Sequence, residues 1–270
     1  MGVVNVTPDS FSDGGRYFDA GAAIAHGLEL EAEGAAILDV GGESTRPGAA
    51  PVAEEEELRR VVPVIEGLIA AGSGAQISID TSKSGVAVRA LAAGATLVND
   101  VTALRGDPKM AGVVANAGAA CCLMHMLGDP RTMQRDPHYD DVVGDIKAFL
   151  EERTAAAVAG GIALERILLD PGIGFGKTVE HNLELIRRLD ELVALGLPVV
   201  IGTSRKSFLG RLTGREVDDR VAATIATNVL AYERGARVFR VHDVAPVRDA
   251  LEVAAATVSA PWTTRTNSTR

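Results

Sequence analysis

Disulfides, membrane spans and an excess of positive charge are all missing from this 270-residue sequence. The two cysteines, Cys121 and Cys122, are neighbours, and their Cα separation of about 3.8 Å is below the usual range for a disulfide. No secretory leader opens the chain, and no apolar run reaches the roughly 18 residues of a membrane helix. We therefore expect a reduced protein of the cytoplasm.

Positive charge is in the minority, with 27 Lys and Arg against 36 Asp and Glu and a net charge of −9. This balance argues against a general binder of nucleic acid or of anionic membranes. An anionic ligand would have to be held by a few local cations instead. Apolar residues make up 47% and charged residues 23%, and this ordinary globular usage excludes disordered, collagen-like and disulfide-scaffold classes.

Several common catalytic templates are also absent. The five histidines show no H-E-x-x-H spacing, the cysteines form no C-x-x-C pair, and no G-x-S-x-G elbow occurs. The residues Gly176, Lys177 and Thr178 match the end of a nucleotide phosphate loop, but Pro171 stands where that loop needs its first glycine. We expect neither a zinc hydrolase nor an ATP-binding loop.

Eight short apolar runs alternate with stretches of helical period. Continuous apolar runs are typical of parallel strands that are buried on both faces. Eight such units in about 250 residues predict a single-domain α/β fold, a (β/α)8 TIM barrel over residues 1–262 with a polar, disordered tail at 263–270. An open doubly wound sheet is the alternative, but the even spacing favours closure. The predicted strands are 2–6, 36–40, 76–80, 95–99, 119–125, 167–170, 198–202 and 237–242.

Helices are expected between these strands, several of them ended by a glycine in the left-handed conformation. The predicted helices are 19–34, 54–71, 82–93, 108–118, 140–160, 179–195, 219–235 and 244–258. The helix-ending glycines are Gly34, Gly94, Gly160 and Gly235.

The predicted strands end in polar residues that do not suit a barrel core. In a barrel the carboxyl ends of the strands meet on one face, where barrel enzymes carry their chemistry. Capping of helices and turns remains an alternative for any one of these residues, but six or more together indicate a small-molecule site. The residues are Asn5, Asp39, Asp80, Asn99, Asp100, His125, Asp170, Ser204 and His242.

Three loops have compositions suited to binding. Residues 7–15 offer hydroxyls, carboxylates and glycines, as in a lid that touches phosphate or metal. Residues 41–48 combine backbone amides with Ser44, Thr45 and Arg46 and suit an anion cradle. An ordinary Gly and Pro turn remains open for each of these two. The third loop, residues 170–178, is interpreted as a tight glycine turn that leaves Asp170 and Phe175 facing the barrel mouth.

Cations gather after the last two predicted strands. Arg240 and His242 occupy alternate positions, so their side chains point the same way. The loops after strands seven and eight are the usual phosphate site of such barrels, and with Lys206 these residues make a plausible anion pocket. Arg205 is expected to be a solvated cation.

Taken together, seven motifs resemble the dihydropteroate synthase family of pterin-binding barrels. They occur in the right order nearly from end to end, one after each appropriate strand. The motifs are NVTPDSFSDGG from Asn5, GGESTRPG from Gly41, SIDT from Ser78, NDV from Asn99, DPGIGFGKT from Asp170, SRKSFLG from Ser204 and RVHDV from Arg240.

The resemblance implies a transferase that joins a dihydropterin methyl diphosphate to p-aminobenzoate in folate synthesis, with Mg2+ as cofactor. Because the family reaction proceeds dissociatively, catalysis should depend on neutralising the leaving group and on positioning the substrates.

The resemblance also implies a role for individual residues. The implied catalytic residues are Asp80, Lys206, Arg240 and His242, and the implied pterin-binding residues are Asp80, Asn99, Asp170 and Lys206. The diphosphate would lie against Asn5, Thr45, Arg240 and His242, with Asn5 as a metal ligand and Asp13 as a possible second one. The p-aminobenzoate pocket would be formed by Thr45, Arg46, Pro47, Phe175, Lys206 and Ser207.

The resemblance also suggests a homodimer through the late helices, residues 219–258, with no nucleic-acid or membrane partner. Two other functions remain open from the sequence. One is a catalytically silent paralogue, which should show broken loop motifs. The other is a pterin-binding methyltransferase acting from methyltetrahydrofolate, against which the retained STRPG, SRKS and RVHDV motifs argue.

Overall fold

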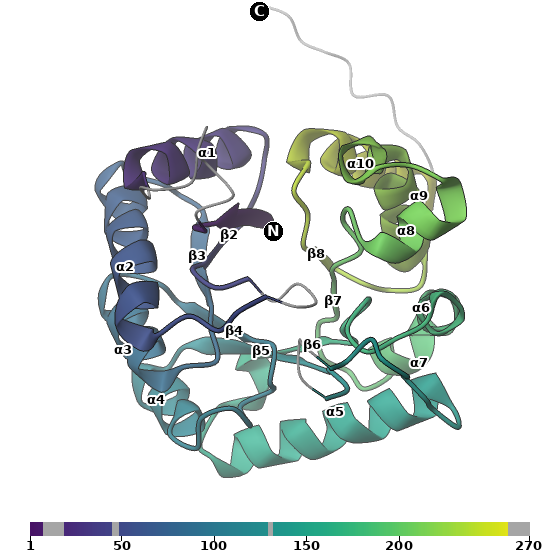
Figure 1. The fold of residues 1–270 in the computed structure, drawn as a ribbon, viewed down its shortest axis with the longest axis horizontal. Coiled ribbons are helices and arrows are strands. Elements are labelled where there is room, and N and C mark those ends of the chain that lie inside the picture. Colours follow the sequence, from purple (N-terminus) through teal and green to yellow (C-terminus); the bar gives the residue numbers. More distant parts are fainter. Residues whose placement is uncertain (8–18, 45–48, 129–131, 259–270) are drawn as a thin grey trace, which may run out of the picture.

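The computed structural model describes residues 1–7, 19–44, 49–128 and 132–258 (Figure 1). The predicted tail at 263–270, most of the loop at 7–15, and Asp13, Thr45, Arg46 and Pro47 lie outside these residues. Six of the strands form one parallel sheet in chain order. They are β1 (Gly2–Asn5), β2 (Ile37–Gly41), β3 (Gln76–Asp80), β4 (Leu97–Asp100), β5 (Ala120–Met124) and β6 (Ile167–Asp170).

Two further strands, β7 (Val200–Ile201) and β8 (Val238–Phe239), close the sheet into a ring. On one side the Leu169 N–H donates to the Pro198 carbonyl at 2.9 Å, beside a parallel bridge between Leu169 and Val199. On the other side the Val3 N–H donates to the Val241 carbonyl at 3.0 Å. The predicted (β/α)8 barrel is therefore confirmed, and the open doubly wound sheet is wrong.

The helices surround the strands as a ring, which Figure 1 shows in a view along the barrel. Among the described residues, no helix is both long enough and apolar enough to cross a lipid bilayer. The helices are α1 (Ala20–Ala32), α2 (Glu54–Ala70), α3 (Ser84–Ala92), α4 (Met110–Ala117), α5 (Val142–Ala159), α6 (Val179–Arg187), α7 (Leu189–Val193), α8 (Ser207–Thr213), α9 (Val221–Glu233) and α10 (Val244–Val258), with short 3-10 turns at Leu164–Arg166 and Val217–Asp219.

The main core lies between this ring of helices and the barrel. In α2, for example, Val61 is fully buried, as are Val64, Ile65 and Leu68, which follow it by three, four and seven residues. This spacing places them on one face of the helix. Burying a side chain of this size stabilises the fold by about 1.5–3 kcal/mol. The packed outer layer therefore holds the strand ends in fixed positions.

Two local expectations need correction. The predicted helix 179–195 is broken at Arg188, whose backbone leaves the helical region and whose side chain bonds to Asp141 and Glu191. The predicted left-handed ending at Gly160 falls instead on Gly161, with φ +95°, because Gly160 keeps helical angles. The endings at the other three predicted glycines are confirmed by their positive φ angles.

Candidate active site

A buried ion-pair network lies within the barrel and joins strands that are far apart in the sequence. The guanidinium of Arg240 donates from Nε to Asp39 Oδ2 at 2.6 Å and from Nη2 to Asp80 Oδ2 at 2.9 Å. Asp39 is fully buried and also accepts hydrogen bonds from Ser78 Oγ at 2.6 Å and from Asn99 Nδ2 at 3.1 Å. Both carboxylate partners of Arg240 belong to strands, so they hold its guanidinium in one orientation.

Strand register explains why three of the predicted site residues lie in one row. Asn5 pairs with Gly41, Gly41 with Asp80, and Asp80 with Asn99. Partners in a parallel register have side chains on the same face of the sheet. Gly41 leaves room in this row, because a Cβ there would lie 3.3 Å from the Cβ of Asp80. The row places one carboxyl and two amide side chains on the same side of the barrel wall.

Burial makes the carboxyl group of Asp80 a weak acid. Desolvation raises its pKa to about 7, against the opposing effect of the Arg240 guanidinium. Asp39, Glu57 and Asp100 raise this pKa further through charge repulsion. Near neutral pH, Asp80 therefore exchanges between a carboxylate that only accepts hydrogen bonds and an acid that also donates one.

Asp170 ends β6 and is tied to the glycine turn that follows it. Its Oδ1 accepts the N–H of Gly172 at 2.6 Å. Gly172 has φ +66°, and a Cβ there would lie 1.9 Å from the His125 carbonyl oxygen, so the turn needs glycine at this position. Burial raises the pKa of Asp170, although Lys206, Arg240 and Lys177 partly offset the effect. The carboxyl group is thus buried among cations.

Lys206 and Phe175 form a contact between two loops at the barrel mouth, the face where the carboxyl ends of the strands meet. The Lys206 ammonium lies 3.9 Å from the centroid of the Phe175 ring, a cation–π distance. Phe175 itself packs on a second apolar cluster, which the strand-end pattern did not reveal. That cluster consists of Val101, Met124, Met126 and Met133.

Arg205, the residue before Lys206, is not the solvated cation that the sequence predicted. Ion pairs and a backbone hydrogen bond hold it in place. Arg205 has φ +57°, an unusual angle for a residue with a side chain. Its guanidinium binds Asp243 at 2.7 Å and Asp218 at 3.1 Å, and its carbonyl accepts a hydrogen bond from Arg220. Arg205 is therefore an anchored residue that fixes the start of α8.

His242 lies beside Ser204 at the end of the last strand pair. Ser204 Oγ accepts the backbone N–H of His242 at 3.2 Å and lies 3.0 Å from His242 Nδ1. A serine hydroxyl can both donate and accept, so this contact can form with either tautomer of the His242 ring. Ser207, also predicted at this site, is exposed at the first position of α8.

The loop after β2 is anchored from both sides of the part that the structure describes. Glu43 accepts the Val52 N–H at 3.2 Å and pairs with Lys83, which also binds the fully buried Glu57 at 2.5 Å. Arg60 donates to the Gly42 carbonyl at 2.8 Å. These contacts fix Gly42, Glu43 and Val52, the described residues on either side of the predicted Thr45, Arg46 and Pro47.

Sequence reasoning missed Asp39 as the centre of the network. The strand-end pattern included it, but the structure places it in the middle of β2, between Leu38 and Val40. A carboxylate between two apolar residues of a buried strand was the available signal, because such a group needs a partner. Its partner, Arg240, is 201 residues away in the chain.

Of the two residues predicted to bind Mg2+, Asn5 and Asp13, the structure describes only Asn5. These residues contain no group of three or more His, Cys, Asp or Glu side chains that could hold a metal ion. Mg2+ often uses only one or two protein ligands and completes its shell with water and phosphate oxygens. A single amide oxygen from Asn5 is compatible with that pattern. It would not be enough to hold a metal ion through protein ligands alone.

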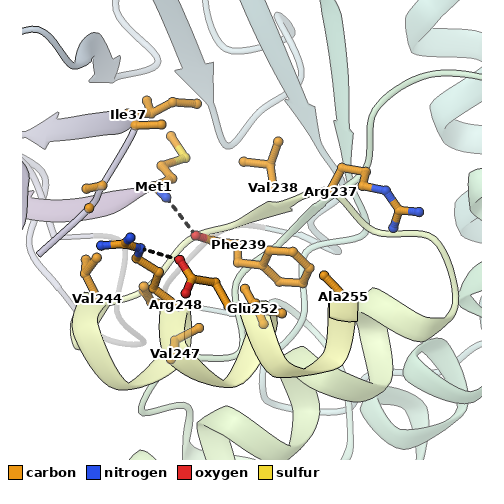
Figure 2. A pocket seen from close by; sticks show the side chains of 15 residues that line it. Met1, Ile37, Arg237, Val238, Phe239, Val244, Val247, Arg248, Glu252 and Ala255 are labelled. Carbon is orange, nitrogen blue, oxygen red and sulfur yellow. Dashed lines mark hydrogen bonds and ion pairs between the residues drawn. The ribbon is translucent and has the colours of Figure 1, made fainter. Parts of the chain in front are cut away.

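A hollow of about 490 Å³ lies at the other end of the barrel, between α10 and the starts of β2 and β8. Figure 2 shows the Met1 ammonium bonded to the Phe239 carbonyl, and Arg248 paired with Glu252 across one wall. The remaining wall is mostly apolar. The polar groups suited to catalysis therefore lie at the mouth and not in this hollow.

Comparison with known proteins gives consistent matches. A sequence profile for the family described as pterin binding enzyme matches residues 1–242. The chain is 49% identical over 263 residues to the dihydropteroate synthase of Mycobacterium leprae, a match that covers 95% of this chain and 92% of that protein.

Two solved structures are similarly close. The Xanthomonas albilineans dihydropteroate synthase with 4-aminobenzoic acid superposes with a TM-score of 0.91 at 52% identity, covering 97% of this chain and 93% of that one. The dihydropteroate synthase from Xanthomonas albilineans in complex with 7,8-dihydropteroate gives a TM-score of 0.88 at 49% identity, covering 97% and 94% of the two chains.

Proposed function

The chain belongs to the pterin-binding enzyme family and catalyses the dihydropteroate synthase reaction, and on that basis we propose how the residues of the barrel mouth divide the work. In this reaction the amine nitrogen of p-aminobenzoate forms a bond to the methylene carbon of 6-hydroxymethyl-7,8-dihydropterin diphosphate. The carbon–oxygen bond breaks, its electron pair leaves with the diphosphate, and the nitrogen loses a proton. The products are 7,8-dihydropteroate and diphosphate.

The observation that supports this assignment of roles is the set of buried and partly buried donors and acceptors at the carboxyl ends of separate strands and in the loop after β7. Asn99 and Asp170 are buried and offer an amide and a carboxyl group, while the partly exposed Asp80 and Lys206 add a second carboxyl group and a charged donor. The amino-pyrimidinone edge of a pterin alternates donors and acceptors, so it matches these groups. A pocket that pairs each polar atom of its ligand rejects analogues that lack one, because a buried partner is then left unpaired.

Apolar surface beside these groups suits the flat faces of the pterin ring. Met124 and Met126 are nearly fully buried and pack with Phe175 next to Lys206. Methionine side chains are polarisable and make favourable contacts with aromatic rings. We therefore assign to this cluster the packing of the ring, while the polar groups set its orientation.

The diphosphate is assigned to Asn5, Thr45, Arg240 and His242. Arg240 keeps its charge at every working pH, and its two carboxylate partners hold the guanidinium in place before the substrate arrives. A donor that is already oriented stabilises the charge that develops on the leaving group without reorganisation in the transition state. Catalysis then comes from neutralising the leaving group and from positioning both substrates, with Asp80, Lys206, Arg240 and His242 as the catalytic residues.

Mg2+ is proposed as the cofactor, held by the amide oxygen of Asn5 and by phosphate oxygens of the substrate. When bound, it would supply positive charge to the leaving diphosphate. Asn5 ends β1 in the same register row as Asp80 and Asn99, so it would hold the ion on the side of the barrel wall that carries those two residues. Asp13 is kept as a candidate second contact.

The p-aminobenzoate pocket is assigned to Phe175, Lys206 and Ser207 together with Thr45, Arg46 and Pro47. Phe175 and Lys206 already touch, and Ser207 follows Lys206 at the exposed start of α8. The guanidinium of Arg46 would pair with the carboxylate of p-aminobenzoate, since arginine binds carboxylates in a two-pronged geometry.

Replacing Arg46 with alanine should weaken p-aminobenzoate binding more than pterin diphosphate binding. We expect the KM for p-aminobenzoate to rise by about tenfold, the effect of losing one charge-assisted pair, while the KM for the pterin substrate changes little. Steady-state kinetics with each substrate varied in turn measures both values. Arg59→Ala, an exposed arginine on α2, is the control, and equal losses for both substrates would contradict the assignment.

The raised pKa of Asp80 predicts that pterin binding improves with pH. The pKa of Asp80 is about 7, so at lower pH its carboxyl group is protonated and accepts fewer hydrogen bonds from the pterin N–H groups. The affinity of the protein for the pterin should therefore rise by about tenfold between pH 6 and 8. Calorimetry with 6-hydroxymethylpterin avoids titration of the diphosphate. Asp80→Asn should bind weakly with no such dependence, and an unchanged pH profile in this variant would assign the titration to another group.

We also propose a cytoplasmic homodimer. The two cysteines are buried as free thiols, which is compatible with a reducing compartment. Large apolar side chains are exposed on the late helices, among them Leu230 on α9 and Val253 on α10, and such residues favour an interface. Sedimentation equilibrium on the purified chain tests the dimer.

A further inference from the structure

Lys177 is a buried lysine to which the proposed reaction gives no role. Only 3% of the residue is exposed. Its ammonium donates to the Phe175 carbonyl at 2.9 Å and lies 3.0 Å from His125 Nδ1. A buried lysine is rare because removing its charge from water is costly, so its presence calls for a physical reason.

The two side chains form a complementary pair at neutral pH. Burial lowers the pKa of His125 to about 3, helped by the charges of Lys177 and Arg105, so the ring is neutral and Nδ1 can accept a hydrogen bond from Lys177. Burial also lowers the pKa of Lys177 to about 7, while Asp170 raises it and Lys206 lowers it. An amine has at least two N–H donors in either protonation state, so both of its hydrogen bonds persist through this titration.

The pair connects the end of β5 to the glycine turn that carries Phe175. This turn contains three glycines with positive φ, Gly172, Gly174 and Gly176, and such a backbone has few intrinsic restraints. It lies close to the segment after β5, since a Cβ on Gly176 would be 2.6 Å from the Cβ of Leu127. Further donors from that segment hold two of its carbonyls, with Tyr139 bonding Gly176 and Gln134 bonding Gly174.

Lys177 holds the carbonyl of Phe175, and Lys206 lies over the ring of the same residue. A Cβ at Gly174 would lie 3.1 Å from Lys206 Cδ, so the turn and Lys206 are in close contact. A shift of the Phe175 carbonyl would therefore move its ring relative to the Lys206 ammonium.

We propose that Lys177, together with His125, is a positioning residue that fixes Phe175 against Lys206 and thereby sets the affinity for p-aminobenzoate. This inference depends on the proposed assignment of Phe175 and Lys206 to the p-aminobenzoate pocket. Lys177 acts through the turn and does not touch the substrate. A lysine serves here because it reaches two acceptors, one in its own turn and one just after β5, from one buried position.

The test is a double-mutant cycle of Lys177→Met and Phe175→Ala. Methionine keeps the length of the side chain and removes both donors. We expect Lys177→Met to raise the KM for p-aminobenzoate by about tenfold, the loss of two buried hydrogen bonds, with the KM for the pterin substrate and kcat within about threefold. Lys109→Met, at an exposed lysine before α4, is the matched control and should leave all three values unchanged.

The second arm of the cycle separates positioning from general stability. If Lys177 acts through Phe175, Lys177→Met should add no further rise in the p-aminobenzoate KM when Phe175 is already alanine. Equal rises in both backgrounds, or equal rises for both substrates, would overturn the inference. A Phe175→Ala variant with an unchanged p-aminobenzoate KM would instead overturn the proposed role of Phe175 in the pocket, and this inference with it.

His125→Phe provides a second route if Lys177→Met does not fold. It removes the Nδ1 acceptor but keeps an aromatic ring next to Phe149, whose centroid is 4.8 Å from the His125 ring. Since one hydrogen bond of the two is lost, we expect a rise of about threefold in the p-aminobenzoate KM, again absent in the Phe175→Ala background. Additive effects in this second cycle would overturn the inference equally.

Discussion

Substitution of Arg240 by methionine is expected to produce the largest loss of activity, a fall in kcat/KM of about a thousandfold. Removing one preorganised donor from a developing negative charge costs about that much in other enzymes, and Arg240 also carries a full charge. Steady-state kinetics in which the pterin substrate is varied from well below its KM, with p-aminobenzoate near saturation, measures the loss.

The same variant should also be less stable. It leaves Asp39, which is fully buried, and Asp80 without their shared cation, and breaking a buried ion pair by removing one partner costs about 3–5 kcal/mol. The control is Arg237→Met, an exposed arginine at the opposite end of the same strand region, which should keep both activity and stability. Wild-type kinetics in Arg240→Met would reject the assignment of the diphosphate site.

Lys206→Ala should lose pterin binding and turnover together. The ammonium lies over Phe175 and near the buried carboxyl of Asp170, so the variant removes a charge from inside the pocket. We expect a fall in kcat/KM of about a hundredfold or more, as for other groups that orient a substrate. Kinetics and calorimetric titration with the pterin substrate measure the two effects.

The effect of Lys206→Ala should be separable from unfolding of α8. Lys206 precedes that helix but makes no side-chain capping bond to it, so shortening the side chain removes no cap. Thermal unfolding should therefore remain close to that of the wild type. Lys109→Ala serves as the exposed control, and normal pterin affinity in Lys206→Ala would contradict its place in the pocket.

The barrel itself could be predicted from the sequence because its physical signals are local. Apolar runs such as 36–40 and 76–80 reflect strands buried on both faces, and glycines such as Gly34 mark helix ends. The shortness of β7 and β8 could not be predicted. Their neighbours β6 and β1 join them through isolated bridges at Val199 and Val241, which depend on how the whole ring closes.

The site was predictable only in part. Polar residues at strand ends meet because parallel strands share a direction, and this places Asp80, Asn99 and Arg240 together as expected. The roles of Asp39 and Lys177 depend on partners far away in the chain, 201 residues for Arg240 and 52 for His125. A pattern of neighbouring residues in the sequence does not predict contacts between residues so far apart. Lys177 matched only the end of a phosphate loop, a motif that this turn does not form.

The most direct measurement is the release of diphosphate after mixing the purified protein with the dihydropterin methyl diphosphate, with and without p-aminobenzoate and with and without Mg2+. We expect release that requires p-aminobenzoate, is accompanied by equal amounts of dihydropteroate and is lost on chelation of the metal. Tight pterin binding with no turnover in the complete mixture would contradict the proposed catalytic site and indicate a silent pterin-binding protein.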